Sequence, residues 1–441
     1  MNFLTGNIKK IYRNYLLAAF GSTMIVPIYG IVDAVMVGQS VGAEGVAAMS
    51  IIAPMWNIIF GLGIWAGVGG GVLLGVAKGK QNQQGEKEAF STALIEAGLM
   101  ALFAYFLIGV FDQGLLRSFG ADQVTLPLAT QYVKAFLPFI PFFLFNQVLA
   151  AFLRNDNAPT LATFAVLGGG LFNVIGDYVF IFIFDMGMTG AALATSIGAI
   201  ITFIIMLTHF ARKNNSLKWT RPQQFLQTAR QITTIGFPTF FVDLAMGILT
   251  VMFNRQISSY LGTNALAVYG IIVNVSTLVQ ACAYSIGQAS QPIMSQNFGG
   301  KAFKRVNELL RYTNQTAISF ALFWTAVVWL FPTLIVKIFM TPTPEILAIA
   351  PAILRVYAIS FLLLPLNIYA TYFFQAILKQ RIAFVVSVAR GMIISALMIY
   401  SLPFFFGGNA LWWAMPITEL LIAIVVIYFM KHYSKQMKKR Y

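Results

Sequence analysis

The chain has 441 residues, of which 59% are hydrophobic and 10% are charged, with a mean hydropathy of +0.77. An ordinary soluble domain carries about 25% charged residues, so this composition excludes a soluble globular protein and predicts an all-α polytopic membrane protein. The 29 Lys and Arg against 14 Asp and Glu lie mostly in short segments between apolar runs, which favours a lipid bilayer over a nucleic acid as partner.

Twelve apolar runs are long enough to cross a bilayer, because about 20 helical residues span its hydrocarbon core. The first run follows the basic segment NIKKIYRN, and we interpret it as a span because it is long and lacks a clear signal-peptide cleavage site. The predicted spans cover residues 14–38, 46–76, 90–111, 127–152, 159–184, 188–210, 233–258, 265–295, 314–340, 350–377, 382–406 and 409–430.

Lys and Arg gather in alternate connecting segments, as they do in cytoplasmic loops. These segments are the N-terminus, the connections that follow every second span, and a tail that holds Lys431, Lys435, Lys438, Lys439 and Arg440. In the opposite loops only Arg117 and Lys337 occur. The pattern predicts an inner-membrane protein with both termini in the cytoplasm and an even number of spans.

The two halves of the chain resemble each other at a constant offset. VGAEGVAAMSII begins at 41 and LGTNALAVYGII at 261 (261 − 41 = 220), while FDQGLLRSFGA begins at 111 and FPTLIVKIFMT at 331 (331 − 111 = 220). Six spans followed by six in the same orientation predict two pseudo-symmetric six-helix lobes around a central cleft. We assign residues 1–211 to the N-terminal lobe, 212–230 to a cytoplasmic basic linker, and 231–441 to the C-terminal lobe with its tail.

Catalytic signatures do not occur in the sequence. GVAKGK is one residue short of a phosphate-binding loop and lacks its Ser or Thr, and HExxH does not occur. The two histidines, His209 and His432, lie at cytoplasmic span ends, and the single cysteine, Cys282, lies in an apolar run. We therefore expect no enzyme, no metal site and no cofactor other than a coupling ion, and the intramembrane charged residues become the candidates for function.

Four stretches of the sequence resemble the multidrug and toxic compound extrusion (MATE) family. They are VDAVMVGQSVGAEGVAAMS (32–50), FLRNDNAP (152–159), NVIGDYVFIFIFDMGMTGAALATSIG (173–198) and GFPTFF (236–241). The resemblance extends over essentially the whole chain and implies twelve helices in two six-helix lobes.

This resemblance also implies a site. In the family the aspartate of the VDxxxVG motif binds a cation or a proton, which implies the same role for Asp33. The sequence resembles the prokaryotic branch related to DNA-damage-inducible protein F more than the NorM branch, and in the former a polar network surrounds that aspartate. The positions that match this network are Tyr132, Asn173, Asp177 and Thr195.

Helical spacing independently allows these residues to meet. Asp33 lies near the outer end of span 1, Asn173 and Asp177 share one face in the outer half of span 5, and Thr195 is early in span 6. Two carboxylates at one depth repel each other when both are ionised, so the pair can hold a proton or a cation. The alternatives are a helix cap or hydrogen bond for Asp33, an interhelical clamp for Asn173 and Asp177, and simple packing for Tyr132 and Thr195.

Charged residues also occur within spans of the C-terminal lobe, namely Asp243, Arg390 and Glu419. Arg390 and Glu419 form either a neutralising pair or, with Asp243, a second ion or substrate site. The NorM branch of the family often has acids in spans 7 and 10. Here Met246 occupies the first position and span 10 has no acid, although Asp243 lies three residues away on the same face.

The resulting prediction is a secondary antiporter, expected to be a monomer, that exports amphipathic, mostly cationic compounds in exchange for H⁺ or Na⁺ by alternating access. The ion entering from outside would occupy the Asp33–Asp177 pair and displace the substrate. The alternative is a lipid-linked oligosaccharide flippase of the same two-lobe plan. An anionic cargo should favour several basic residues in the cleft, where the only candidates are Lys134, Arg355 and Arg390.

Overall fold

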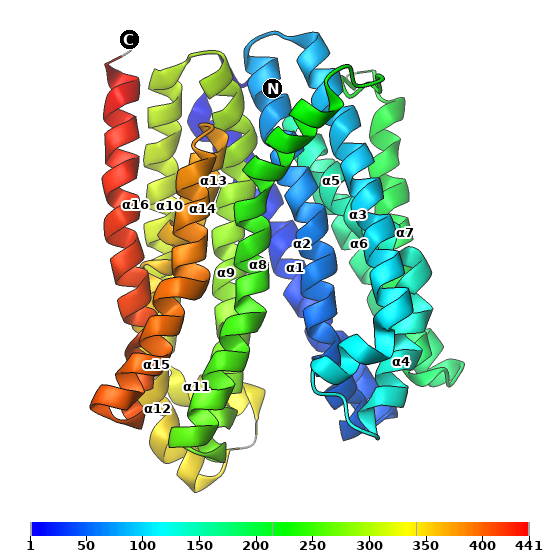
Figure 1. The fold of residues 1–441 in the computed structure, drawn as a ribbon, viewed down its shortest axis with the longest axis vertical. Coiled ribbons are helices and arrows are strands. Elements are labelled where there is room, and N and C mark those ends of the chain that lie inside the picture. The colour runs from blue at the N-terminus through cyan, green and yellow to red at the C-terminus, as the bar shows by residue number, and fades with distance from the viewer. Residues whose placement is uncertain (1, 214, 341, 440–441) are drawn as a thin grey trace. The chain divides into compact units, whose positions relative to one another are not determined.

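A computed structural model of the protein describes residues 2–213, 215–340 and 342–439. These residues fold into helices joined by short segments, as Figure 1 shows. Among the described residues, eleven helices are long and apolar enough to cross a membrane, and a bent pair of helices brings the number to as many as twelve. The prediction of an all-α polytopic membrane protein is therefore confirmed. Arg440, which we assigned to the basic tail, lies outside the described residues.

The chain divides into two compact units, and unit 1 covers Leu17–Phe240. In it α6 packs on α7, while α2 packs on α3 and α5. Unit 1 contains α1 (Ile8–Ser40) from Leu17 onward, α2 (Ala43–Gly79), α3 (Gln83–Ser118), α4 (Thr125–Phe136), α5 (Ile140–Asn155), α6 (Pro159–Asp177), α7 (Gly187–Leu207) and the first part of α8 (Phe225–Tyr260).

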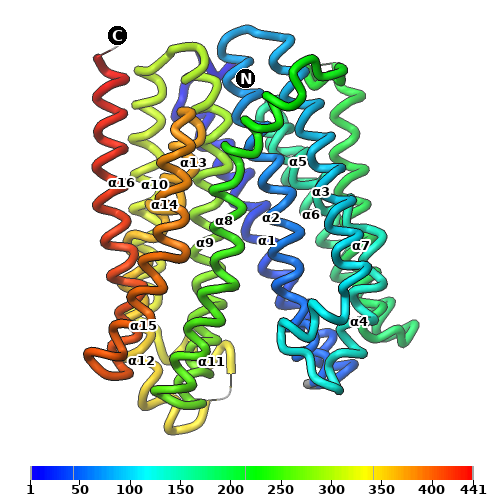
Figure 2. Tube along the Cα trace, viewed as in Figure 1, coloured from blue at the N-terminus to red at the C-terminus, as the bar shows by residue number. Residues whose placement is uncertain are grey.

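Unit 2 consists of Asn2–Leu16 and the chain from Phe241 onward. Figure 2 traces α9, α10, α13 and α16 of this unit, and α9 packs on both α10 and α13. Its helices are the rest of α8, α9 (Thr263–Gly299), α10 (Phe303–Leu330), α11 (Pro332–Phe339), α12 (Pro344–Ala358), α13 (Leu364–Ala376), α14 (Gln380–Val388), α15 (Ile394–Phe406) and α16 (Ala414–Lys438).

Local backbone irregularities recur at the predicted offset. Gly42 and Gly262, at the starts of α2 and α9, have φ of 87° and 81°, and they lie 220 residues apart (262 − 42 = 220). A glycine adopts this conformation without the steric cost that a Cβ would add. Gln81 and Lys301, after the ends of the same two helices, both have φ of 57° and the same separation (301 − 81 = 220). The two halves therefore repeat in local conformation as well as in sequence.

The predicted span 314–340 is bent in the structure. Its helix breaks between Leu330 and Pro332, and α10 and α11 meet at a bend of 84°. Proline lacks the N–H that a continuing helix needs and disfavours helical dihedrals at the residue before it, so Phe331 adopts φ −124° and ψ 41°. The matching residue Phe111 (331 − 111 = 220) is also non-helical, with φ −112° and ψ 19°, but no proline follows it and α3 continues.

Candidate ion-binding site

Glycines bring three helices of unit 1 close together around the predicted site. A Cβ on Gly169 of α6 would lie 2.4 Å from the Gly198 carbonyl oxygen of α7, so these two backbones touch. On the next residue, Gly170, a Cβ would lie 2.1 Å from the ring of Tyr29 in α1. The Tyr29 hydroxyl donates a hydrogen bond to the Val166 carbonyl at 3.1 Å. Small residues thus set the short distances between α1, α6 and α7.

Asp33, Asn173 and Thr195 meet where these helices approach. The Asn173 Nδ2 donates to Asp33 Oδ1 at 3.4 Å and to Thr195 Oγ1 at 3.1 Å. Thr195 Oγ1 lies 3.4 Å from Asp33 Oδ2 and 3.0 Å from the Ala191 carbonyl, and its single proton serves one of them at a time. Both Asp33 and Asn173 are buried. The Asp33 carboxylate is therefore held by weak, long hydrogen bonds.

Asp177 is the least satisfied group of the site. Its side chain is fully buried, and no donor among the described residues reaches either of its oxygens. The carboxyl group of Asp33 lies close enough to interact with it electrostatically. Two facing carboxylates have acceptors only, and burying an ionised group without a partner is costly. A proton or a small cation between the two carboxyl groups would satisfy both.

Tyr132 of α4 completes the predicted set. Its side chain is buried, interacts with Thr195, and lies within electrostatic range of both Asp33 and Asp177. The Tyr132 ring also packs edge-on against Trp56, with ring centroids 6.4 Å apart. All five residues predicted from the N-terminal half are thus brought together, next to an aromatic cluster formed by Trp56, Phe60, Phe136 and Phe143.

The backbone changes its hydrogen-bonding pattern at this site. Helix α6 ends at Asp177 and continues as a π-helical turn over Tyr178–Ile183. Such turns are rare and frequently occur at functional sites, because they re-aim the side chains beside them. We did not predict this turn from the sequence.

In unit 2 the three predicted charged residues make two sets of hydrogen bonds, and Tyr284 lies within electrostatic range of both Asp243 and Arg390. The Arg390 guanidinium donates to Glu419 Oε1 from Nε at 2.9 Å and from Nη2 at 2.7 Å. Asn367 Nδ2 donates to the other oxygen of Glu419 at 2.7 Å. Asp243 accepts a hydrogen bond from the Tyr284 hydroxyl at 2.7 Å. Sequence reasoning missed Asn367 and Tyr284, although both are polar residues inside predicted spans.

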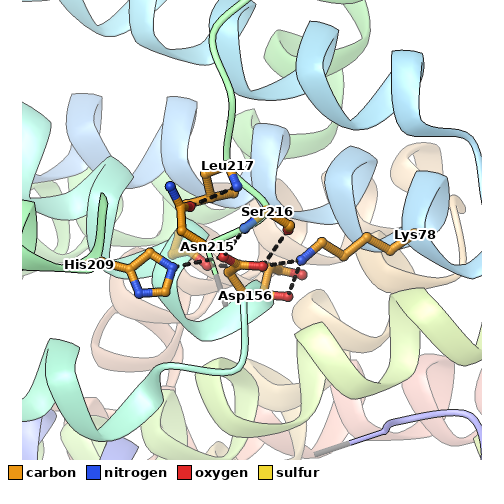
Figure 3. Close-up of polar contacts among 8 residues, drawn as sticks. Lys78, Asp156, His209, Asn215, Ser216 and Leu217 are labelled. Carbon is orange, nitrogen blue, oxygen red and sulfur yellow. Dashed lines mark hydrogen bonds and ion pairs between the residues drawn. The ribbon is translucent and has the colours of Figure 1, made fainter. Parts of the chain in front are cut away.

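A second polar network in unit 1, which the sequence analysis also missed, surrounds Asp156 between α5 and α6. Figure 3 shows Lys78, His209 and Ser216 pointing at its carboxylate. Lys78 Nζ lies 2.5 Å from Oδ1 and His209 Nε2 lies 2.7 Å from Oδ2. Ser216 donates from its backbone N at 2.9 Å and from Oγ at 2.5 Å.

Electrostatics keep Asp156 ionised. Burial alone would raise the pKa of this carboxyl, but the hydrogen bond from His209 and the Lys78 ammonium hold it below its usual range. Glu86 of α3 also lies within electrostatic range of Asp156. The signal that could have indicated this network is that Lys78, Asp156 and His209 all lie in, or at the edge of, predicted cytoplasmic segments.

Comparisons with known proteins agree with this fold. The MatE family model matches residues 18–179 and 238–401. The multidrug export protein MepA of Staphylococcus saprophyticus subsp. saprophyticus is 26% identical over 415 residues, which cover 92% of this chain and 90% of the relative. MepA of Staphylococcus haemolyticus is 25% identical over 430 residues, which cover 97% and 94%.

Two solved structures share the fold at 20% sequence identity, each covering 99% of this chain and 98% of its own. One is an outward-facing conformation of a multidrug resistance MATE family transporter of the MOP superfamily, with a TM-score of 0.91. The other is a MOP superfamily transporter from Pyrococcus furiosus, with a TM-score of 0.92, described as having a binding pocket of reverse polarity that suggests a different function. Because the matched segments make up well over half of the sequence, the protein belongs to the MatE family, the multidrug and toxic compound extrusion transporters.

Proposed function

We propose that the protein is a secondary active antiporter that exports amphipathic, mostly cationic compounds, and that Asp33 and Asp177 bind its coupling ion. The observation that supports this most directly is the pair of buried carboxyl groups, of which Asp177 has no hydrogen-bond donor within the described residues. A structural clamp would pair its acceptors with donors, as Asn367 and Arg390 do for Glu419. A site that alternately gains and loses a cation needs acceptors that are free between the two events.

The exchange follows from charge balance at this pair. With both carboxyl groups ionised, the site attracts a cationic substrate nearby. When H⁺ or Na⁺ enters from outside and binds between Asp33 and Asp177, the attraction falls and the substrate leaves. Thr195 Oγ1 and the Asn173 side-chain oxygen are further acceptors that a Na⁺ ion would use, since Na⁺ prefers oxygen ligands, whereas a proton needs only the two carboxyl groups.

Substrate chemistry is inferred from the walls beside the site and from the relatives. Trp56 and Phe60 are partly exposed and lie in the aromatic cluster next to Tyr132. Aromatic faces attract organic cations while accommodating apolar groups of varied shape. Two relatives over nearly the whole chain are named multidrug export proteins, which supports small-molecule export.

An anionic cargo is less well supported. Of the three basic residues considered for a flippase, Arg390 is neutralised by Glu419, and Arg355 Nε donates to the Trp329 carbonyl at 3.1 Å. The membrane placement remains as predicted from the basic loops: we place the protein in the cell membrane as a monomer, with both termini and the Asp156 network on the cytoplasmic side.

Efflux of a fluorescent cationic dye from energised cells tests the proposal. Wild type is compared with Asp33→Asn and Asp177→Asn at matched expression, with and without a protonophore, and with Na⁺ replaced by K⁺. Asp185→Asn is the matched control, because it makes the same change at an exposed residue in the turn after α6. We expect both site variants to lose efflux and the control to keep it. Normal efflux by Asp33→Asn, or no dye efflux by wild type, would refute the proposal.

A further inference from the structure

Two helices of this protein belong to both compact units. The start of α1 lies in unit 2, within Asn2–Leu16, whereas its continuation from Leu17 lies in unit 1. For α8 the order is reversed, because its start up to Phe240 lies in unit 1 and the rest lies in unit 2. In alternating access, a helix that belongs to both units must bend or slide whenever the units move. The starts of α1 and α8 are therefore mechanically important positions.

The segment before α8 is fixed to unit 1 by side chains outside the ion site. Asp156 accepts two hydrogen bonds from Ser216, as described above. Further along, the backbone N–H of Thr220 donates to Ser91 Oγ at 2.9 Å. The N–H of Gln223 donates to Glu88 Oε1 at 3.1 Å. Three contacts in eight residues hold the linker along α3 and the α5–α6 loop.

The segment before α1 is fixed to unit 2 in an equivalent way. Arg305 Nη2 donates to the carbonyl oxygens of Phe3 at 2.8 Å and Gly6 at 2.6 Å. The Nε of Arg305 donates to Asn297 Oδ1 at 3.0 Å, and Asn297 Nδ2 donates to the same Phe3 carbonyl at 3.1 Å. Both helices that change unit thus begin in a segment tied down by a buried or half-buried charged side chain.

Close packing continues the attachment into α8 itself. A Cβ on Gly236 would lie 1.9 Å from the Trp65 carbonyl of α2. The Trp65 Nε1 donates to the Thr233 carbonyl at 2.8 Å. Pro238 follows within the helix, next to the point where α8 changes unit. A proline removes one backbone hydrogen bond, so bending costs least there.

We propose that Asp156 and Arg305 are positioning residues for transport, which anchor the starts of α8 and α1 while the units move. In this arrangement α8 stays attached to unit 1 through the whole cycle and bends near Pro238, and α1 stays attached to unit 2. The inference rests on the proposed transport function, since only alternation between two states makes an anchor necessary. It adds residues that touch neither the coupling ion nor the substrate.

A reversible tether tests whether α8 stays attached. In a Cys282→Ser background, Ser91→Cys and Thr220→Cys place two thiols at the contact between α3 and the linker, and a short bis-thiol reagent joins them. We expect the tethered protein to export dye at nearly the untethered rate, because the contact never opens. Loss of efflux on tethering, regained on cleavage of a reducible reagent, would overturn the proposal.

Rescue distinguishes positioning from a general loss of structure. Asp156→Ala should lower the maximal efflux rate about tenfold with little change in the half-saturating dye concentration, and the tether should restore the rate. Ser216→Ala removes one of these hydrogen bonds and should have a smaller effect on the efflux rate. It replaces Asp156→Ala in the assay if Asp156→Ala fails to accumulate. Arg305→Gln is the equivalent variant for α1. Failure of the tether to restore either Asp156→Ala or Ser216→Ala would refute a positioning role.

A readout without transport separates this inference from the proposed function. Lys218, which Trp219 follows, is an exposed trypsin site within the anchored linker, whereas the Arg221–Pro222 bond resists trypsin. In purified protein, Asp156→Ala should be cut there about tenfold faster than wild type, because the linker leaves unit 1 more often. Unchanged cleavage refutes the anchor even if dye efflux is normal. Faster cleavage of Asp156→Ala, combined with no dye export by the wild type, would leave the anchor standing and refute the transport proposal instead.

Discussion

Removal of the Glu419 carboxylate should destabilise unit 2 by about 3–5 kcal/mol, the range for breaking a buried ion pair. Glu419 has no solvent exposure and accepts three hydrogen bonds, two from Arg390 and one from Asn367. The variant Glu419→Gln keeps the size and an acceptor but leaves the guanidinium charge without a counter-charge. The cost arises mainly from that unpaired charge and only in part from the lost hydrogen bonds.

The measurement is the free energy of unfolding in mixed detergent micelles, with Glu345→Gln as the control. Glu345 is exposed at the start of α12, so the same chemical change should alter stability by about 0.5 kcal/mol or less. The double variant Arg390→Met with Glu419→Leu should recover most of the loss, because an apolar replacement of a buried pair is often neutral.

The two readings of this pair differ in one result. A neutralising pair predicts that Glu419→Gln loses stability and that the double variant regains both stability and dye efflux. If Glu419→Gln is as stable as wild type, the structural reasoning fails. If it is stable but transports no dye, Glu419 belongs to a second ion site.

Two further outcomes follow from packing and charge. Gly236→Ala should lower the yield of folded protein, because the added Cβ would meet the Trp65 carbonyl oxygen. Gly247→Ala should be neutral or stabilising by up to about 1 kcal/mol, because no described atom lies within 4 Å of the added Cβ. Thermal unfolding of both variants tests this difference. The pKa of Asp156 is lowered in the fold by His209 and Lys78, so its contribution is present above its unfolded pKa of about 4 and is lost as the pH falls further. The stability difference between wild type and Asp156→Asn should therefore be constant from about pH 6 to 8 and shrink below about pH 4; a difference that grows in acid would contradict the assignment.

Features set by local sequence were predictable. Apolar runs located the membrane helices, and the offset of 220 anticipated the matching conformations of Gly42 and Gly262. Helical spacing placed Asn173 and Asp177 on the face that meets Asp33. The bend at Phe331 could also have been predicted, because Pro332 follows it. A search for apolar runs overlooks it, since it averages over many residues.

Features set by contacts between distant segments were not predictable. The partners of Asp156 come from positions 78, 209 and 216, and no periodicity links a loop carboxylate to them. No donor among the described residues reaches Asp177, and this depends on the side chains of every neighbouring helix. Likewise, the change of unit within α1 and α8 is a property of packing, since each helix is continuous in sequence and in backbone.

The contact of Gly170 with the Tyr29 ring has a consequence for screens of inactive mutants. A methyl group at position 170 would displace the Tyr29 ring and break its hydrogen bond to Val166 of α6, and a methyl group at 169 would meet the Gly198 carbonyl of α7. On the proposed function, selections for lost drug export should therefore recover substitutions at glycines 169, 170 and 198 alongside those at Asp33 and Asp177. Such a set of mutants would identify the residues that set the spacing of the helices as well as the carboxylates of the proposed ion site.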